Sequence, residues 1–283
     1  CLDRFHPLNK QPSKKKYGTG RFVRIPVDKP EILNFVPRYY CRYGLPLEAF
    51  QQALNQMPQP DVILVTSGMT YWYQGVQFAI QFLKEKYPKV PIVLGGIYAT
   101  LCYNHAVNNS GADFIIRGPG EIKALKLVDS LTGNHHEINE RTILFPEPTF
   151  RHYQKLVSIP IFTSYGCPFH CSFCASNLLS GKFRQRNPQE VIDEIFYYYF
   201  KRRVRHFAFF DDALLINQEK HLAVILGEII NKKINIFFHT PNGIHPREIT
   251  PDLAKKMYKA NFKTLRLSYE SIDKKRQQEM GLK

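Results

Sequence analysis

Three cysteines, Cys167, Cys171 and Cys174, lie within one short segment at a C-x3-C-x2-C spacing. The segment follows an apolar run that predicts a β-strand, so we expect the thiols on a loop at a strand end. Iron–sulfur clusters are bound by Cys thiolates, and a cluster with four irons normally uses four of them. Three thiolates from one loop would bind three irons and leave the fourth open to a ligand. An open coordination position distinguishes a reactive metal site from a sealed structural one.

A structural zinc site is the alternative interpretation of the same cysteines, with His170 or a distant histidine as the fourth ligand. Zinc sites usually combine two C-x2-C pairs, or two cysteines with two histidines. This chain has no second such pair. The spacing therefore favours an iron–sulfur cluster, and a non-catalytic zinc-containing nucleic-acid-binding module stays open as an alternative.

The length of 283 residues suggests about two domains at roughly 150 residues each. With 44% hydrophobic and 22% charged residues, the composition excludes a disordered or fibrous chain. No run of apolar residues is long enough to cross a membrane, so no membrane partner is expected. The net charge of +15 is carried mainly by residues 1–60 and 181–283. Such a surplus indicates either an ordinary solvated surface or a surface for nucleic acid.

The cellular compartment follows from the first residues and from the cysteine usage. Residues 1–20 are polar and rich in lysine, with no apolar core of a secretory signal. The other cysteines, Cys1, Cys41 and Cys102, are scattered and do not form a disulfide framework. We therefore expect a cytoplasmic protein.

The elements that would position the cysteines form two α/β series. Residues 1–46 are a basic, proline-rich lead-in that we expect to be irregular. Residues 47–150 alternate apolar strands with amphipathic helices, which predicts a doubly wound, flavodoxin-type Rossmann-like domain with a parallel sheet. The expected strands are 61–66, 92–94 and 113–116, and the expected helices are 47–57, 76–86, 98–109 and 121–131. Ligands of such sheets bind at the carboxyl ends of the strands.

The second series, residues 158–283, begins after a proline-bearing linker. Its expected strands are 159–164, 206–210, 234–238 and 264–269, and its expected helices are 188–200, 218–231 and 251–260. Four strands separated by helices resemble half of a (βα) barrel, whose chemistry lies at the carboxyl ends of the strands. The cysteine segment directly follows the first of these strands.

At this point the chain resembles the radical S-adenosylmethionine superfamily, because the C-x3-C-x2-C segment has an aromatic residue, Phe173, just before its third cysteine. The resemblance covers about residues 158–283. It implies a 4Fe-4S cluster on the three cysteines and S-adenosylmethionine on the open iron. An electron from the cluster would then cleave the sulfonium to give methionine and a 5′-deoxyadenosyl radical. Related partial barrels have six strands, so the four found here predict a truncated barrel.

The resemblance also implies residues that contact S-adenosylmethionine at the strand ends. A common Gly-Gly-Glu segment is replaced here by Asp-Asp after the second strand. A turn is the competing interpretation of that pair and of the Pro-Asn-Gly after the third strand. The expected cofactor contacts are Phe173, Asp211, Asp212, Asn242, Ser268 and Glu270. No residue is assigned a direct catalytic role.

Residues 47–150 resemble the cobalamin-binding-like domain that precedes many radical enzymes of this class. The resemblance rests on a Gly-Gly strand end and on the Gly-rich turn from Arg117 to Glu121. It implies cobalamin as a third cofactor, with contacts at Ser67, Gly95, Gly96, Gly118 and Glu121. The sequence lacks Asp-x-His-x-x-Gly, so the histidine that ligates cobalt in methionine-synthase-like domains is missing. The aromatic run Tyr71–Tyr73 either lines a corrin or packs as loop side chains.

Together these features predict a radical S-adenosylmethionine enzyme that methylates or rearranges its substrate, with cobalamin as the suggested second cofactor. A methylthiotransferase-like RNA-modifying enzyme is the alternative that the basic charge favours. The substrate is then either a small molecule or an RNA. The expected protein partner is an electron donor such as flavodoxin or ferredoxin.

Overall fold

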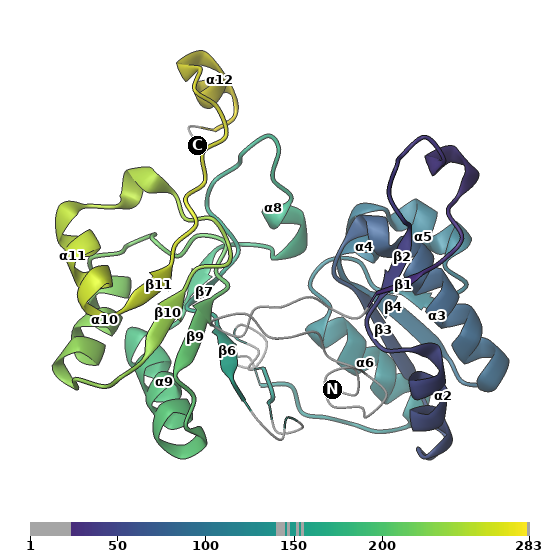
Figure 1. Cartoon of the computed structure of the whole chain (residues 1–283). Coiled ribbons are helices and arrows are strands. Elements are labelled where there is room, and N and C mark those ends of the chain that lie inside the picture. The colour runs from purple at the N-terminus through teal and green to yellow at the C-terminus, as the bar shows by residue number, and fades with distance from the viewer. Residues whose placement is uncertain (1–23, 140–144, 146–147, 151–152, 154–155, 282–283) are drawn as a thin grey trace.

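A computed structural model of the chain describes residues 24–139, 145, 148–150, 153 and 156–281. The chain forms two lobes that stand side by side, each built on a parallel sheet (Figure 1). This mixed α/β architecture confirms the fold class expected from the alternation of strands and helices. Within the described residues no helix is both long enough and apolar enough to cross a membrane.

The first lobe contains a three-stranded parallel sheet in the order β3-β4-β5. Its strands are β3 (Ile63–Ser67), β4 (Ile92–Gly95) and β5 (Phe114–Ile115). Its helices are α2 (Leu47–Asn55), η3 (Thr70–Trp72), α3 (Tyr73–Lys86), α4 (Gly96–Leu101), α5 (Tyr103–Asn109) and α6 (Glu121–Thr132). The central strand β4 is buried along its apolar run, as expected for a parallel strand covered by helices. Ile80 of α3 and Tyr98 of α4 pack against Ile92 and Leu94 of that strand.

The sequence predicts one helix over residues 98–109, and the structure divides it into α4 and α5. The division falls at Cys102, whose φ of −116° and ψ of 44° lie outside the helical region. The two pieces remain linked because the Tyr98 hydroxyl lies 2.7 Å from His105 Nδ1. On α4, the Thr100 hydroxyl oxygen accepts a hydrogen bond from the Gly118 N–H at 3.0 Å. The short helix α4 is thereby tied to the loop that follows β5.

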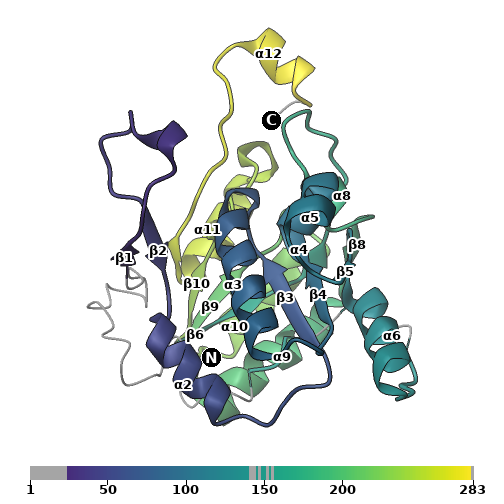
Figure 2. The ribbon, with the colours of Figure 1, turned by 90° about the vertical axis from the view of Figure 1, so that its right-hand side faces the viewer.

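The lead-in contains more structure than the sequence indicated. Residues 24–43 include an antiparallel pair, β1 (Arg24–Pro26) and β2 (Cys41–Tyr43), and the short helix η2 (Glu31–Leu33). Tyr40 forms a hydrogen bond with Gln74, and the Arg42 guanidinium lies 5.9 Å from the ring centre of Phe78. Both partners are on α3, so the lead-in lies along that helix (Figure 2).

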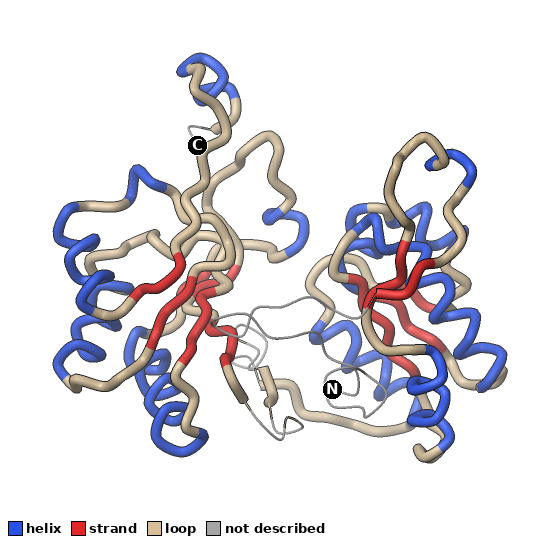
Figure 3. Tube along the Cα trace, in the orientation of Figure 1, coloured by secondary structure: helices blue, strands red, loops and turns tan. Residues whose placement is uncertain are grey.

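The second lobe contains a four-stranded parallel sheet in the order β11-β10-β9-β6. Its strands are β6 (Ser158–Ile161), β9 (His206–Phe209), β10 (Phe237–His239) and β11 (Phe262–Thr264). Its helices are α8 (Ser176–Leu179), α9 (Pro188–Arg202), α10 (Leu222–Asn231), η4 (Pro246–Glu248), α11 (Pro251–Lys259) and α12 (Lys274–Glu279). Helices α9, α10 and α11 cover the face of the sheet that points away from the first lobe (Figures 1 and 3).

The helices that cover this sheet begin at clear sequence signals. Asn187 precedes Pro188, and its side-chain oxygen accepts a hydrogen bond from the Gln189 N–H at 2.9 Å. Thr250 caps α11 in the same way, with Pro251 as the first helical residue. A side-chain oxygen at this position satisfies a backbone N–H that the helix itself leaves without a partner, and proline fits the next position. These signals explain why α9 and α11 begin where the sequence predicts.

The last strand lies a few residues earlier than the sequence predicts. A strand was expected over residues 264–269, whereas β11 is Phe262–Thr264, followed by a single bridge between Ile244 and Leu267. Phe262 fixes the position, because its ring packs 5.9 Å from Phe209 and 5.3 Å from Phe238. The alternating leucines beyond it are exposed instead. Aromatic packing with distant residues therefore sets the position of β11, and Leu265 and Leu267 of the predicted range lie beyond it.

Truncation of Phe238 should strongly destabilise the second lobe. Its side chain is fully buried among Phe207, Phe209 and Phe262. We expect Phe238→Ala to lower the free energy of unfolding by about 3–5 kcal/mol, because it removes apolar contacts and leaves a cavity. Urea denaturation followed by circular dichroism measures the change. Tyr258→Ala, at an 86% exposed position, is the matched control and should stay within about 0.5 kcal/mol. Equal losses in the two variants would contradict the assignment of Phe238 to the core.

Candidate metal and cofactor site

The three cysteines lie on a loop that is closed at its base by two short strands. β7 (Ser164–Tyr165) and β8 (Arg184–Gln185) pair antiparallel, and the residues between them carry the cysteines and α8. β7 comes soon after β6, so the loop starts at the carboxyl end of that strand. We refer to residues 166–183 as the cysteine loop.

A glycine is required where the cysteine loop begins. Gly166 has a φ of +72°, a conformation that glycine adopts without strain. A Cβ at this position would lie 2.8 Å from the Gly181 carbonyl oxygen and 3.2 Å from Lys182 backbone atoms. The two ends of the loop therefore approach closely just before Cys167. This close approach holds the first cysteine at the base of the loop.

The cysteines differ in their exposure to solvent. Cys171 is buried, Cys167 is partly buried and Cys174 is exposed. The Cys174 N–H donates to the Cys171 carbonyl oxygen at 3.0 Å, which forms a tight turn between them. Burial raises the pKa of the Cys167 thiol, and the negative charges of Cys174 and Cys171 raise it further.

The donor set fits a cluster better than a single metal ion. Among the described residues, no three His, Cys, Asp or Glu side chains converge as ligands of one ion. The ligands of a tetrahedral zinc must converge on one point. A cubane cluster binds each thiolate at a different iron, so three thiols spread along one loop suit its corners.

Contacts from two other segments hold the middle of the cysteine loop. The Phe169 ring lies 4.6 Å from the Arg247 guanidinium and 5.9 Å from the His245 ring, next to η4. The Asn177 amide donates to the Phe169 carbonyl oxygen at 3.1 Å. Gly281 lies against Cys171, since a Cβ there would be 3.1 Å from the Cys171 Cα. The segment after α12 therefore contributes to the burial of Cys171.

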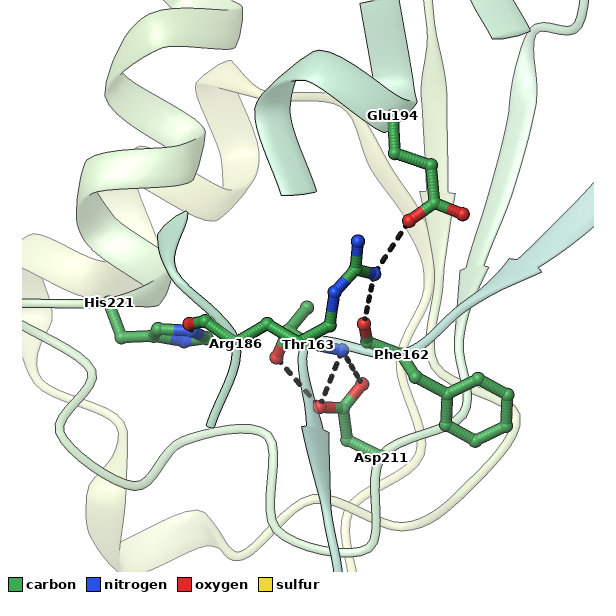
Figure 4. A network of polar contacts seen from close by, with 6 residues as sticks. All are labelled: Phe162, Thr163, Arg186, Glu194, Asp211 and His221. Atoms are coloured by element: carbon green, nitrogen blue, oxygen red, sulfur yellow. Dashed lines mark hydrogen bonds and ion pairs between the residues drawn. The ribbon is translucent and has the colours of Figure 1, made fainter. Parts of the chain in front are cut away.

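Asp211 binds the start of the loop rather than facing outward. Its fully buried carboxylate accepts hydrogen bonds from the Thr163 N–H at 3.1 Å, the Thr163 hydroxyl at 2.7 Å and the Ser164 hydroxyl at 2.7 Å. Figure 4 shows the Thr163 contacts. Burial raises the pKa of Asp211, and these hydrogen bonds oppose the rise. The carboxylate joins the end of β9 to the residues that lead into the cysteine loop.

Arg186 forms a second anchor at the other end of the loop (Figure 4). Its guanidinium donates to the Phe162 carbonyl oxygen at 2.8 Å and to the Glu194 carboxylate of α9 at 2.6 Å. The Arg186 carbonyl lies 3.0 Å from His221 Nε2, at the start of α10. A largely buried ion pair of this kind is costly to break, because removal of one partner leaves a buried charge. Both ends of the loop are therefore fixed to the body of the lobe.

Three of the residues expected near S-adenosylmethionine lie at the carboxyl edge of the second sheet. The Ser180 hydroxyl donates to Asp212 at 3.2 Å, so Asp212 faces the cysteine loop. The Asn242 amide donates to the Phe210 carbonyl oxygen at 2.8 Å and thereby connects the ends of β9 and β10. Ser268 lies against Gly243, where a side chain would collide with its hydroxyl. These residues come together along the edge that carries the cysteine loop.

The remaining residues expected near S-adenosylmethionine are placed differently. Phe173 is 45% exposed on the cysteine loop, and Glu270 is exposed beyond β11. Asp211 is occupied by its contacts with Thr163 and Ser164. The structure thus places Asp211 beneath the loop, whereas Phe173 and Glu270 are at the surface.

The residues expected near cobalamin follow the strands of the first sheet. Ser67 is buried at the end of β3, and its hydroxyl donates to the Met69 carbonyl oxygen at 2.7 Å. Gly95 and Gly96 end β4 and begin α4; at Gly96, with a φ of +89°, a Cβ would lie 2.5 Å from the Ser67 carbonyl oxygen. The missing side chain lets β3 and α4 approach closely. Gly118 and Glu121 lie on the turn after β5 and at the start of α6.

The carboxyl edges of the two sheets meet at the cysteine loop. Helix α4, which follows β4, packs against α8 of the loop (Figure 1). The Pro119 side chain, on the turn after β5, would be 3.9 Å from a Cβ at Gly181. The turns expected to hold cobalamin therefore lie next to the loop expected to hold the cluster.

Sequence patterns did not identify Thr163, Arg186, Glu194 and His221 as parts of the site. Their partners are 24 or more residues away in the chain, apart from the Arg186–Glu194 pair. The sequence contained two signals. One is the polar pair Thr163–Ser164 shortly before Gly166, and the other is Arg186, which lies eight residues before Glu194 on the next helix. Neither signal identifies its partner without the fold.

Comparison with known proteins gives two family matches. A model of the radical SAM superfamily matches residues 161–283, and a model of the B12 binding domain matches residues 39–128. An uncharacterized methyltransferase of Pyrococcus horikoshii is 25% identical over 197 residues, which are 59% of this chain and 43% of that protein. An anaerobic magnesium-protoporphyrin IX monomethyl ester cyclase of Synechocystis is 26% identical over 190 residues, which are 56% of this chain and 38% of that protein. The chain spans less than half the length of either relative.

Among solved structures, the radical S-adenosylmethionine methyltransferase TsrM from Kitasatospora setae is similar, with a TM-score of 0.64 and 15% identity. The match covers 81% of this chain and 52% of that chain. At this level of identity the similarity shows a common fold. It extends over both lobes, because neither lobe alone accounts for that share of the chain.

Removal of the Asp211 carboxylate should loosen the cysteine loop. In Asp211→Ala the Thr163 N–H and the Thr163 and Ser164 hydroxyls lose a buried acceptor, which we expect to cost about 3 kcal/mol of unfolding free energy. The variant should also bind less iron than the wild type after anaerobic reconstitution. Urea denaturation and iron analysis measure the two effects. Asp212→Ala, at the exposed neighbouring carboxylate, is the matched control and should keep wild-type stability. If Asp211→Ala unfolds like the control, Asp211 is not an anchor.

Proposed function

We propose that the chain acts as a cobalamin-dependent radical S-adenosylmethionine enzyme. The proposal is supported by the match of residues 161–283 to the radical SAM superfamily and of residues 39–128 to the B12 binding domain. The proposed reaction is the transfer of a methyl group to carbon, with rearrangement as the competing outcome. The relative named as a methyltransferase supports methyl transfer, and the relative named as a cyclase supports rearrangement.

The observation that carries the proposal is the contact between the two sheet edges. Helix α4 begins at the Gly95–Gly96 turn and packs against α8, which follows Cys174. The turn at Pro119 lies beside Gly181 at the other end of the cysteine loop. A methyl transfer that uses two cofactors requires both of them near one substrate. The fold of this chain would bring the two binding regions together in this way.

Cys167, Cys171 and Cys174 would hold a 4Fe-4S cluster. When bound, the cluster supplies the electron that cleaves S-adenosylmethionine, and cobalamin carries the methyl group. The protein holds the cysteines in place through Gly166, through the Phe169–Arg247 contact and through the anchors at the two ends of the loop. Such positioning is the protein's part in cofactor chemistry.

The proposed contacts of S-adenosylmethionine are Asp212, Asn242, Ser268, Glu270 and Phe173. The first three lie along the carboxyl edge of the second sheet, where ligands of parallel α/β folds bind. Asp211 would act indirectly, because its carboxylate already accepts hydrogen bonds from the Thr163 and Ser164 hydroxyls. The pair Asp211–Asp212 thus divides into a buried anchor and an exposed candidate ligand.

The proposed partners are a small-molecule substrate and an acidic one-electron donor such as flavodoxin or ferredoxin. The basic charge of +15 is compatible with such a donor, because complementary charges speed encounter. The same charge is compatible with RNA as substrate. The match of residues 39–128 to a B12 binding domain favours the cobalamin-dependent methyltransferase over the methylthiotransferase-like alternative.

Replacement of one cysteine of the loop tests the proposal. Cys171→Ala should abolish the visible absorbance of the cluster and the formation of 5′-deoxyadenosine, because the cluster would lose one of its three ligands. The assay is anaerobic reconstitution with iron and sulfide, followed by chromatography of the products formed from S-adenosylmethionine. Cys41→Ala, at a partly buried cysteine on β2, is the matched control and should retain both signals. Cleavage of S-adenosylmethionine by the Cys171 variant at the wild-type rate would refute the assignment.

A further inference from the structure

Nine cationic side chains gather at the amino end of the second sheet. Residues 201–205 carry four of them, residues 232–236 carry two and residues 256–263 carry three, and no acidic residue lies in these three ranges. Each range joins the end of a helix to the start of the next strand, from α9 to β9, from α10 to β10 and from α11 to β11. We name these nine side chains the basic rim.

The three parts of the basic rim lie side by side. β9, β10 and β11 are neighbours in the sheet, and α10 packs against both α9 and α11. Packed helices lie about 8–10 Å apart, so three helix ends in a row extend over roughly 20 Å. The cysteine loop lies at the opposite, carboxyl ends of the strands (Figure 1). The basic rim is therefore a surface apart from the candidate cofactor site.

The cations of the basic rim are not neutralised by acidic neighbours. Eight of the nine are exposed, and Arg202 is partly exposed. None of the nine forms an ion pair with another residue that the structure describes, whereas Lys255, just before the third range, lies 3.7 Å from Asp252. A concentration of one sign of charge at a surface attracts ligands of the opposite sign. The basic rim therefore favours an anionic ligand.

Stabilisation of the helix ends explains only part of the basic rim. Cations in the last turn of a helix interact favourably with its dipole, and this effect falls off within that turn. Arg205 and Lys263 lie beyond the ends of α9 and α11, on the connections to the strands and at β11 itself. Their charges need another explanation.

Two cations of the basic rim occupy a backbone conformation that does not favour them. Arg203 and Lys233 follow α9 and α10 with φ values of +54° and +50°. Glycine or asparagine normally occupies this left-handed position after a helix. The third turn follows that preference, since Asn261 has a φ of +64°. Backbone geometry therefore does not account for the positive charge at Arg203 and Lys233.

Exposed aromatic rings lie among these cations. Phe200 directly precedes the first range and is 59% exposed, and Tyr258 lies within the third range and is 86% exposed. Rings beside cations are typical of surfaces for single-stranded nucleic acid, because unpaired bases stack on the rings while the cations contact the phosphates. A duplex keeps its bases paired and offers them less readily to a ring. The rings therefore favour a single strand over a duplex.

We propose that the basic rim binds single-stranded nucleic acid through its phosphates, with Tyr258 and Phe200 as stacking positions for bases. A single small anion would need cations that converge on one point, whereas these cations are distributed over three turns. An acidic electron donor must approach the cluster, and the basic rim lies at the other end of the strands. An extended chain of phosphates fits both the charge and the length of the basic rim. The inference does not depend on the proposed function.

The salt dependence of binding tests the proposal. The probe is an unstructured, fluorescein-labelled RNA of about 20 nucleotides, long enough to cover a typical single-strand site. Fluorescence anisotropy gives its dissociation constant for the cluster-loaded protein between about 0.05 and 0.2 M salt, where each phosphate contact adds about 0.7 to the slope of log affinity against log salt. We expect a slope magnitude of about 3 or more, which corresponds to at least about four contacts.

Glycine at the two left-handed positions separates a binding role from a structural one. Arg203→Gly combined with Lys233→Gly should weaken RNA binding about tenfold or more at about 0.1 M salt and lower the slope magnitude by about 1.4, because two phosphate contacts are lost. Glycine is unstrained at both positions, so the midpoint of thermal unfolding should be unchanged or higher. Wild-type affinity in this variant would overturn the proposal.

The matched control removes the same charge from the first lobe. Lys89→Gln combined with Lys126→Gln changes two exposed lysines and should leave RNA affinity within about twofold of the wild type. An equal loss in the control and in the glycine variant would show that net charge, and not the basic rim, determines binding.

The stacking position has its own test. Tyr258→Ala should weaken RNA binding about fivefold or more without a change in the salt slope, because it removes a ring and no charge. A DNA strand of the same sequence should also bind, since both polymers carry phosphates, and the tighter of the two identifies the source of the ligand. Tighter binding of a duplex would contradict the assignment to single strands. Binding to vesicles that contain phosphatidylserine, with no binding of RNA or DNA, would overturn the proposal in favour of a membrane surface.

The outcome for the basic rim is separate from that for the proposed function. The glycine variant should form 5′-deoxyadenosine at the wild-type rate, because Arg203 and Lys233 lie away from the cysteine loop. Loss of RNA binding with normal cleavage of S-adenosylmethionine supports the basic rim. Absence of cleavage in the wild type, with RNA binding that depends on Arg203 and Lys233, overturns the proposed function and leaves the basic rim standing.

Discussion

The arrangement of the candidate site depends on one buried carboxylate. Asp211 accepts three hydrogen bonds from Thr163 and Ser164, and these residues lead directly into the cysteine loop. A carboxylate buried in this way is tolerated only when donors surround it, so the end of β9 and the entry to the loop must stay together. The Arg186–Glu194 pair fixes the exit of the loop to α9. The cysteines lie between these two fixed ends.

The sequence was informative where chemistry depends on close spacing along the chain. Three thiols within one loop and the alternation of apolar strands with helices both led to correct predictions of the cofactor class and fold class. The role of Asp211 could not be read in the same way. An acidic residue at a strand end suits a ligand contact as well as an anchor, and its partners are 47 and 48 residues away. Similarly, the position of β11 is set by the packing of Phe262 on distant aromatic rings, which the neighbouring residues in the sequence do not reveal.

The two lobes contribute different kinds of structure to the candidate site. The first lobe presents short backbone turns, in which glycines let strands and helices approach one another. The second lobe presents reactive side chains on a loop with two fixed ends. Helix α4 connects these regions, because it starts at the glycine turn of one lobe and packs against the cysteine loop of the other. Movement of one lobe relative to the other would therefore change the distance between the two proposed cofactor sites, and the contact between α4 and α8 links them.

The unequal exposure of the three loop cysteines has a further physical consequence. Cys174 is exposed to solvent, whereas Cys171 is buried. A thiol reagent reacts only with a sulfur atom that it can reach. In the protein without bound metal, such a reagent would therefore modify Cys174 before Cys171.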